Sequence, residues 1–333
     1  MAVSSAYRAP RWLPGGHLQT IYPALFVRRP QVIYRRERWD TPDGDFVDLD
    51  WISPDAPRQR AAGTAHRPAA PLLVLFHGLE GSSTSHYAHA LMAQVRDLGW
   101  RGVVVHFRGC SGEPNRLARA YHSGDSAEID WVIRRLSDFA SAPLYAAGVS
   151  LGGNALLKWL GEQGGTAAHL VRGAAAVSAP LDLMAAGDAL GRGFNLVYTR
   201  AFLSSLKRKS LAKLAAHPQI YDAALVRAAQ TLRAFDNVVT APLHGFRDTD
   251  DYWTRASSKP WLAQIAVPTL LVNARNDPFM PHTALPQAHD VSRYVTCEFP
   301  DGGGHVGFVS GPFPGHIDWL PRRIIDFLRH SDC

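Results

Sequence analysis

The residues best suited to chemistry form the segment Gly148-Val149-Ser150-Leu151-Gly152, which fits the pattern G-x-S-x-G. A short apolar run from Pro143 to Ala147 precedes it and predicts a buried strand. Good helix formers with apolar residues at helical spacing follow it, from Gly153 to Leu160. A serine on a strained turn between a strand and a helix is a nucleophile elbow, where glycines avoid collisions across the turn. The pattern predicts that Ser150 is a catalytic nucleophile, placed at the positive end of a helix where an oxyanion is favoured.

A serine hydroxyl needs a histidine base at neutral pH, and the histidine needs a carboxylate to orient it. Asp277 follows a predicted strand at Leu270–Asn273, and His305 follows the last predicted strand, Tyr294–Phe299. Such groups are expected on loops at the carboxyl ends of the strands of an open sheet. The glycines at 302–304 would let a tight loop aim the His305 imidazole at the serine.

The chain contains fifteen histidines, so His305 is chosen by its position and not by its identity. Asp290 and Asp301 are the rival acids. Asp290 precedes the final strand, and Asp301 lies too near His305 in sequence to be its usual orienter. Two further histidines in this part of the chain, His289 and His316, are expected at the surface.

A developing oxyanion needs two backbone N–H groups aimed at it. One is expected from Leu151, the residue after the nucleophile. The other is expected from the loop after the predicted strand Leu72–Phe76, at Leu79 in the sequence His77-Gly78-Leu79. By itself that loop would be an ordinary glycine-rich turn, but its pairing with the elbow favours the functional interpretation.

Motifs for cofactors and metals are absent or out of context. Residues 302–307 formally fit G-x-G-x-x-G, but no second strand and ribose-binding acid follow, so a dinucleotide site is not expected. Neither a phosphate-binding loop pattern nor H-E-x-x-H occurs. Cys110, Cys297 and Cys333 include no C-x-x-C pair, which favours free thiols in a reducing compartment over disulfides or a zinc site. We therefore expect no cofactor, no metal and a cytoplasmic location.

Composition excludes several classes of protein. The chain has 333 residues, 46% hydrophobic and 19% charged, as in ordinary soluble globular proteins. It has no apolar run near the roughly 18 residues that span a bilayer, and no apolar signal-peptide core at its start. Its net charge of +6 comes from scattered basic residues without aromatic interleaving, so no nucleic-acid partner is expected. Peripheral contact with anionic lipid, or an acidic substrate, remains open.

The elements that must position these residues alternate between strands and helices, which predicts βαβ units and a parallel sheet. A hairpin is expected at Arg38–Ile52, after an extended or loop-like start that includes Trp12–Thr20. Residues 56–70 are expected to form a surface loop. Between about residues 180 and 259 the alternation lapses into a helical pattern, which predicts a cap inserted into a single domain of residues 1–333.

Several different short motifs occur jointly and span nearly the whole chain. They are His17-Leu18-Gln19-Thr20, His77-Gly78-Leu79-Glu80-Gly81, Arg108-Gly109-Cys110-Ser111-Gly112, Tyr121-His122-Ser123-Gly124-Asp125, Gly148–Asn154, Asp251-Tyr252-Trp253 with Ala256-Ser257-Ser258, and Asn276-Asp277-Pro278. With them the chain resembles the serine hydrolases of the α/β-hydrolase superfamily and, more narrowly, the AB hydrolase 4 family of YheT-like hydrolases. The resemblance implies a mostly parallel, doubly wound sheet with an antiparallel amino-terminal hairpin and a helical cap.

The resemblance also implies a charge-relay triad of Ser150, Asp277 and His305 that hydrolyses carboxylic esters, with short- or medium-chain acyl esters or lipid esters as substrates in some relatives. Our leading hypothesis is a carboxylesterase- or lipase-like serine hydrolase that forms an acyl-enzyme. An acyltransferase with the same acyl-enzyme is the nearest alternative, and a binding protein with a vestigial site is the second. The residues at 17–20 suggest no chemistry, and packing of the amino-terminal arm is expected there.

Overall fold

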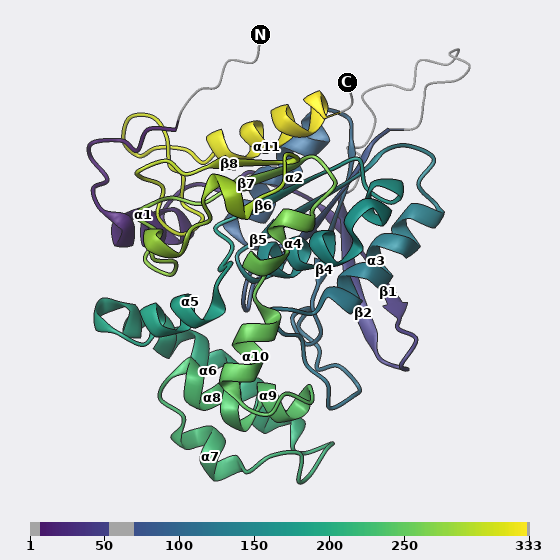
Figure 1. The fold of residues 1–333 in the computed structure, drawn as a ribbon, viewed down its shortest axis with the longest axis vertical. Helices are drawn as coiled ribbons and strands as arrows, with labels where there is room; N and C mark the ends of the chain where they lie inside the picture. The colour runs from purple at the N-terminus through teal and green to yellow at the C-terminus, as the bar shows by residue number, and fades with distance from the viewer. Residues whose placement is uncertain (1–6, 53–69, 332–333) are drawn as a thin grey trace.

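The computed structural model describes residues 7–52 and 70–331. Its strands form one eight-stranded sheet in the spatial order β1-β2-β4-β3-β5-β6-β7-β8 (Figure 1). β1 pairs antiparallel with β2, and β2 pairs antiparallel with β4, while all other neighbouring strands are parallel. The strands span Tyr34–Asp40 (β1), Phe46–Ile52 (β2), Leu72–Phe76 (β3), Arg101–His106 (β4), Leu144–Val149 (β5), Gly173–Val177 (β6), Thr269–Val272 (β7) and Val295–Glu298 (β8).

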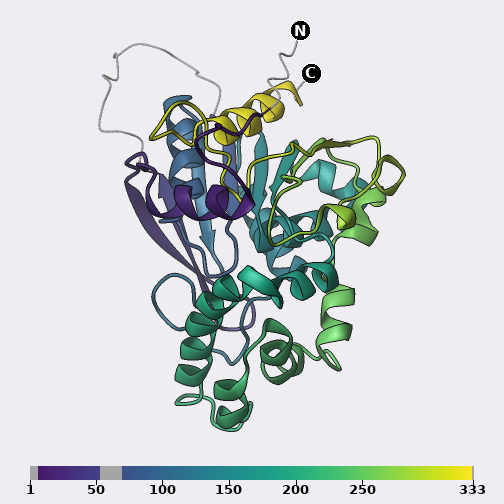
Figure 2. The same cartoon turned by 90° about the vertical axis from the view of Figure 1, so that its left-hand side faces the viewer.

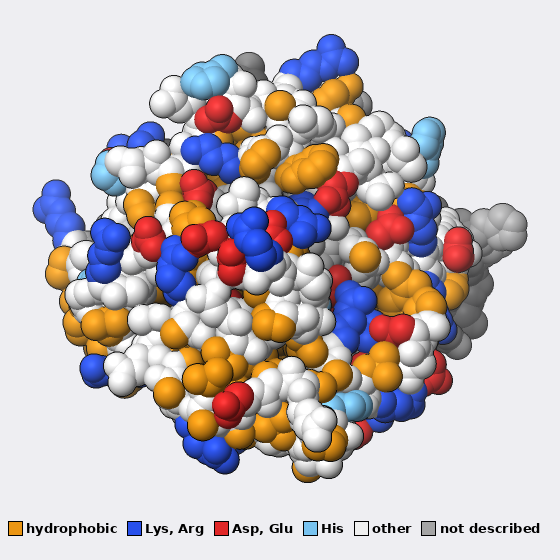
Figure 3. Space-filling model, turned by 60° about the horizontal axis from the view of Figure 1, so that its bottom comes forward, with side chains coloured by type: hydrophobic (Ala, Val, Ile, Leu, Met, Phe, Trp, Pro, Cys, Tyr) orange, Lys and Arg blue, Asp and Glu red, His pale blue; other side chains and the backbone are white. Residues whose placement is uncertain are grey.

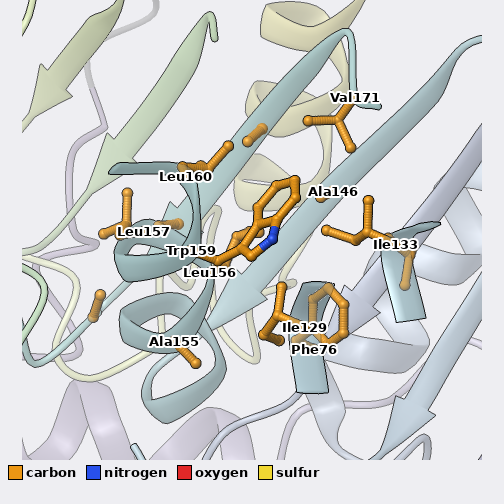
Figure 4. Packing of buried hydrophobic residues seen from close by; sticks show 14 of the residues in the cluster. Phe76, Ile129, Ile133, Ala146, Ala155, Leu156, Leu157, Trp159, Leu160 and Val171 are labelled. Carbon is orange, nitrogen blue, oxygen red and sulfur yellow. The ribbon is translucent and has the colours of Figure 1, made fainter. Parts of the chain in front are cut away.

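Helices cover both faces of the sheet, because successive strand residues point to opposite faces and both sets are apolar. In β3, Leu73 and Leu75 pack with α2 (His86–Asp97) and α11 (Trp319–His330). The other β3 side chains face α3 (Ser126–Asp138) and α4 (Leu151–Gln163). Figure 4 shows this second layer, in which Trp159 of α4 packs among Phe76, Ile129 and Ile133.

The region between β6 and β7 is helical and lies beyond one end of the sheet (Figures 1 and 2). We call residues 183–256 the helical segment. It contains α5 (Leu183–Leu190), η2 (Gly193–Asn195), α6 (Leu196–Lys213), α7 (Ala223–Ala228), α8 (Leu232–Val238), α9 (Thr240–Leu243) and α10 (Thr249–Ala256). Seen from this end, side chains of both charges are scattered over the surface, with hydrophobic side chains exposed between them (Figure 3).

The two ends of the helical segment meet. The Lys259 backbone N–H donates to the carbonyl of Leu181 across 2.9 Å. The buried Asn154 side chain of α4 donates to the Ala256 carbonyl at 2.8 Å and accepts from the Ser258 N–H at 3.0 Å. Since one amide binds the returning chain twice, the helical segment is anchored to the same helix that begins at the predicted nucleophile.

Short helical elements complete the chain, namely α1 (Gly16–Leu25), η1 (Gly164–His169), η3 (Lys259–Gln264), η4 (His282–Ala284) and η5 (Ala288–Asp290). No helix in the described part of the chain is long and apolar enough to cross a membrane.

The predicted fold class is confirmed, because the sheet is mostly parallel, carries an amino-terminal antiparallel hairpin and has helices on both faces. The predicted surface loop at 56–70 falls almost entirely outside the described residues.

The extended or loop-like start predicted at Trp12–Thr20 is confirmed as far as Gly15, where the chain forms turns, and is wrong from Gly16 on, where α1 begins. Gly15, Gly16 and Pro23 give this stretch a poor helix propensity. The helix forms because tertiary contacts, described below, outweigh that propensity.

Candidate active site

Ser150 lies on a sharp turn between β5 and α4, with a left-handed backbone at φ 52° and ψ −121°. This conformation is strained for a residue with a side chain, and it brings neighbouring backbone close. A Cβ on Gly152 would lie 2.4 Å from the Phe76 carbonyl oxygen, and a Cβ on Gly148 would lie 2.5 Å from the Gly152 carbonyl oxygen. Both positions therefore require glycine, as the G-x-S-x-G pattern predicts.

The structure brings the side chains of Ser150, Asp277 and His305 together in one hydrogen-bonded series. The His305 Nε2 lies 3.0 Å from the Ser150 Oγ, and the His305 Nδ1 lies 2.9 Å from the Asp277 Oδ2. The Asp277 side chain is fully buried, and its second oxygen accepts from the Phe279 N–H at 2.8 Å. The Phe279 ring also stacks on the imidazole, with centroids 4.1 Å apart. The acid and the ring are thus held from several sides, in a geometry suited to proton transfer from the serine.

The rival residues have other partners. Asp290 accepts from the Gln287 N–H at 2.8 Å as part of a capping box on η5. Asp301 is fully exposed and faces Arg275. His289 and His316 are also exposed, beside Asp290 and Asp318 respectively.

Two buried side chains of α1, Gln19 and Thr20, hold the loop that carries His305. The Gln19 Oε1 accepts from the Gly303 N–H at 2.7 Å, and its Nε2 donates to the Leu13 carbonyl at 2.8 Å. The Thr20 Oγ1 accepts from the His305 N–H itself at 2.9 Å. The expectation that this segment packs the amino-terminal arm thus misses its direct contact with the histidine loop.

Asn276 joins this loop to the one that carries Asp277. Its Oδ1 accepts from the Gly304 N–H at 3.0 Å, and its Nδ2 donates to the Gln19 Oε1 at 2.9 Å. The contact is close, because a Cβ on Gly16 would lie 1.9 Å from the Asn276 carbonyl oxygen. The acid loop, the histidine loop and α1 therefore form one hydrogen-bonded unit.

The backbone N–H groups of Leu79 and Leu151 have no hydrogen-bond partner within the described residues. The Gly78 carbonyl, on the same peptide as the Leu79 N–H, accepts from the His77 Nδ1 at 2.7 Å and from the Gly81 N–H at 2.9 Å. A trans peptide points its C=O and N–H in opposite directions, so these bonds turn the Leu79 N–H the other way. Both leucines line the same cavity as Ser150.

His77 is neutral in this arrangement. Its Nδ1 donates to Gly78, and its Nε2 accepts from the Phe107 N–H at 3.1 Å, so each ring nitrogen has the partner that the neutral ring requires. Burial lowers its pKa to about 3. The histidine is therefore a fixed structural support for the loop at 77–81.

Glu80, next in the same loop, connects this loop to the helical segment. It has a left-handed backbone at φ 56°, and its N–H donates to the Tyr121 hydroxyl at 2.9 Å. The Glu80 carboxylate accepts hydrogen bonds from Tyr121, from Ser205 of α6 and from Lys209 of α6, the last at 2.8 Å. Sequence reasoning gave Glu80 no role, since its partners are distant in the chain.

A cavity of about 820 Å³, including the part open to solvent, separates Ser150 from the helical segment. Its wall is mostly apolar and comes from both sides, with Leu79, Tyr121, His122, Ser123, Leu151, Pro180, Phe279 and His305 beside Ser150, and Leu183, Ala186, Gly187, Leu190, Phe202, Leu206, Leu232, Phe235, Asp236, Thr240, Tyr252 and Trp253 from the helical segment.

Asp236 is the carboxylate on the helical side of this cavity. It accepts from the Thr240 hydroxyl at 2.6 Å and from the Trp253 Nε1 at 2.9 Å. Burial raises its pKa to about 6. An acid in such a site is neutral more readily than in water, which keeps that wall of the cavity weakly polar at mildly acidic pH.

No cluster of three or more metal-ligating side chains occurs among residues 7–52 and 70–331. Cys110, near the cavity, is a free thiol whose pKa burial raises to about 11. It is therefore a poor candidate for a reactive thiolate.

Comparison with known proteins gives a family match, two similar relatives and a similar solved structure. Residues 71–312 match the family model described as alpha/beta hydrolase fold. The chain is 42% identical over 315 residues to YheT of Escherichia coli (strain K12), a proposed esterase, covering 94% of this chain and 89% of that one. It is 30% identical over 335 residues to the Homo sapiens phospholipase ABHD3, covering 98% of this chain and 79% of that protein. Among solved structures, the Pyrococcus furiosus esterase Pf2001 aligns with a TM-score of 0.55 at 14% identity, over 90% of this chain and 93% of that one.

Proposed function

Because the chain belongs to the α/β-hydrolase superfamily, in its YheT-like branch, and is an ester hydrolase, we propose that it acts through an acyl-enzyme on Ser150. The observation that carries this proposal is the series Ser150 Oγ, His305 Nε2 and Nδ1, and Asp277 Oδ2, with contacts of 3.0 and 2.9 Å. Geometry of this kind lets one imidazole serve as base and then as acid.

In the first step, the Ser150 Oγ attacks the carbonyl carbon of the ester, and His305 takes the hydroxyl proton. Asp277 keeps the imidazole in the tautomer that accepts at Nε2 and stabilises the imidazolium that forms. The N–H groups of Leu79 and Leu151 hold the developing oxyanion, since neither has another partner among the residues that the structure describes. The imidazolium then protonates the leaving alcohol.

In the second step, His305 takes a proton from water, which attacks the acyl carbon and forms the same oxyanion. The imidazolium returns its proton to Ser150 as the acid leaves. No cofactor or metal takes part in this scheme.

The helical segment acts as a cap over a single α/β domain and shapes the acyl site. Its contribution to the cavity wall includes Leu183, Phe202, Leu206 and Phe235, which suit an acyl chain better than a charged group. We propose short- to medium-chain acyl esters or lipid esters as the substrates.

The test is hydrolysis of p-nitrophenyl esters from acetate to palmitate by the purified protein, beside Ser150→Ala. We expect turnover in the wild type, at least about 10³-fold loss in the variant, and an optimum chain length set by the cavity. A fluorophosphonate probe should label the wild type and not the variant.

Two outcomes would redirect the proposal. Wild-type protein that neither turns over esters nor reacts with the probe would mean that the triad is not assembled, and a binding role would replace catalysis. Products that are mostly transesters when alcohols are added would instead indicate an acyltransferase.

A further inference from the structure

Exposed apolar side chains gather on one side of the molecule. Ten large hydrophobic side chains are exposed in the described part of the chain, and six of them lie on α1 and its end, around the start of α6, and in the loop before residue 314. These six form what we call the apolar face, namely Leu18, Leu25, Phe26, Phe194, Val197 and Phe313. The most exposed are Phe313 at 73% and Leu25 and Phe26 at 68% each.

Contacts between aromatic rings join these segments, which are separate in the sequence, into one continuous surface. Trp12 contacts Phe313 and Tyr22, with centroids 5.5 and 5.2 Å apart, and Tyr22 contacts Phe26 at 5.6 Å. On the same helix, His17 packs against Phe194 with centroids 4.6 Å apart. Figure 2 shows α1, in purple, facing the viewer directly above the teal helices of the helical segment. An exposed apolar surface of this kind marks an interaction site more often than chance.

The segments that carry the apolar face are strongly basic. Residues 1–36 contain six arginines and no acidic residue, and residues 189–221 contain six lysines and arginines and no acidic residue. Since the whole chain carries +6, everything outside these two segments carries a net −6. Four of these twelve cations, Arg35, Arg36, Arg192 and Lys209, pair with carboxylates outside the two segments. The remaining excess of positive charge lies in the segments that bear five of the six exposed apolar side chains.

Several of these cations are free to bind an external anion. Arg11, Arg28 and Arg200 are exposed and form no ion pair with any described residue. Arg28 follows Phe26 at the end of α1, and Arg200 lies three residues after Val197, which places it on the same side of α6. Arginine beside leucine and phenylalanine fits the boundary of a phospholipid bilayer, where cations meet phosphates and apolar side chains enter the acyl region.

We propose that the apolar face and its arginines dock the protein on an anionic membrane surface. Docking itself does not depend on the catalytic scheme. The further idea that docking lets lipid esters pass from the membrane into the cavity rests on the proposed function. The geometry suits that use, because Tyr198 of α6 hydrogen-bonds His17 at 3.1 Å and contacts the Phe279 ring at 4.8 Å. Phe279 in turn stacks on His305, so the docked surface adjoins the cavity.

The experiment is cosedimentation of the full chain, carrying Ser150→Ala to prevent lipid turnover, with vesicles of phosphatidylcholine alone or with about 30 mol% phosphatidylglycerol. We expect binding to the anionic vesicles that is at least about tenfold stronger than to the neutral ones and that weakens at high salt. The double changes Leu25→Ser with Phe26→Ser, and Arg28→Glu with Arg200→Glu, should each reduce it by about tenfold or more.

Matched controls lie off the face. Leu225→Ser changes a side chain on α7 that is 54% exposed, and Arg172→Glu changes an exposed arginine before β6. Both should bind as the parent does. Equal binding to neutral vesicles, no binding to either, or equal losses in the control variants would overturn the proposal. So would dimerisation of the parent that only the face variants abolish, because the face would then pair two copies.

Hydrolysis of a soluble p-nitrophenyl ester by the same face variants, with Ser150 restored, separates this proposal from the proposed function. We expect their kcat/KM to stay within about twofold of the wild type. Vesicle binding without any esterase activity would leave the docking surface standing and refute only the catalytic scheme.

Discussion

On the sheet side of the cavity, Asp277 and His305 lie on loops that hydrogen bonds from Gln19, Thr20 and Asn276 hold in place, at distances of 2.7 to 3.0 Å. On the opposite side, the helical segment lines the cavity with mostly apolar side chains. These side chains define the shape of the cavity wall by packing, with few hydrogen bonds. Hydrogen bonds fix atoms within tenths of an ångström, whereas apolar packing tolerates substitution at similar volume. Changes on the sheet side should therefore lower kcat for every substrate, and changes on the helical side should alter which substrates fit.

The largest effect after loss of the nucleophile is expected at Asp277. Asp277→Asn keeps the shape but can donate to the His305 Nδ1, which favours the tautomer that cannot accept from Ser150. We expect kcat to fall by about 10³- to 10⁴-fold with little change in KM, for short and long esters alike. An effect confined to one chain length would contradict the division between the two sides.

A smaller loss is expected at the α1 contacts, which touch no reacting atom. Thr20→Val removes the acceptor of the His305 N–H, while Thr20→Ser keeps it and serves as the matched control. We expect kcat to fall about 10- to 100-fold in Thr20→Val and Gln19→Ala, because small displacements of a catalytic group are costly. KM should change little. The rate of fluorophosphonate labelling should fall in parallel, and Thr20→Ser should restore it. Normal labelling in Thr20→Val would show that α1 does not position the histidine.

On the helical side, Leu206→Trp should fill part of the cavity. We expect kcat/KM for long-chain esters to fall about tenfold or more, while acetate ester hydrolysis stays within about threefold of the wild type. Leu206→Met, which nearly conserves volume, is the control and should keep the original chain-length profile. Equal loss on acetate would mean that Leu206 affects the chemistry and not the fit.

The smallest effect concerns Asp236, whose pKa is raised by burial to about 6. The folded protein binds this proton more readily than the unfolded chain, so Asp236 makes stability fall as pH rises from about 4 to about 6. Asp236→Asn should remove that contribution, on the order of 3 kcal/mol. The Tm of the variant relative to the wild type should thus rise between these pH values, as differential scanning calorimetry can measure. A constant Tm difference would exclude a buried, titrating carboxylate.

The sequence predicts the sheet and the elbow because both have local causes. Leu72–Phe76 is a fully apolar run before a glycine-containing loop, and the G-x-S-x-G pattern lies within five consecutive residues between a strand and a helix. Gly148 is required by its close contact with Gly152 within that turn, whereas Gly152 is required by the backbone at Phe76. By contrast, Gln19 contacts Gly303 across 284 residues, and α1 itself contradicts its helix propensity. Glu80 and Lys209 likewise meet across 129 residues. Single-sequence patterns carry no signal for such pairs.

The helical segment leaves and rejoins the domain at one place, where Lys259 bonds Leu181 and Asn154 bonds Ala256 and Ser258. The helical segment could therefore be replaced by a segment of different length, because only the two ends of the new segment would have to reach the same hydrogen-bond partners, Leu181 and Asn154. The entropic cost of a longer insertion grows slowly with its length. Under the proposed function, in which this segment shapes the acyl site, replacing it would change substrate choice, provided that the new segment again supplies partners for Glu80.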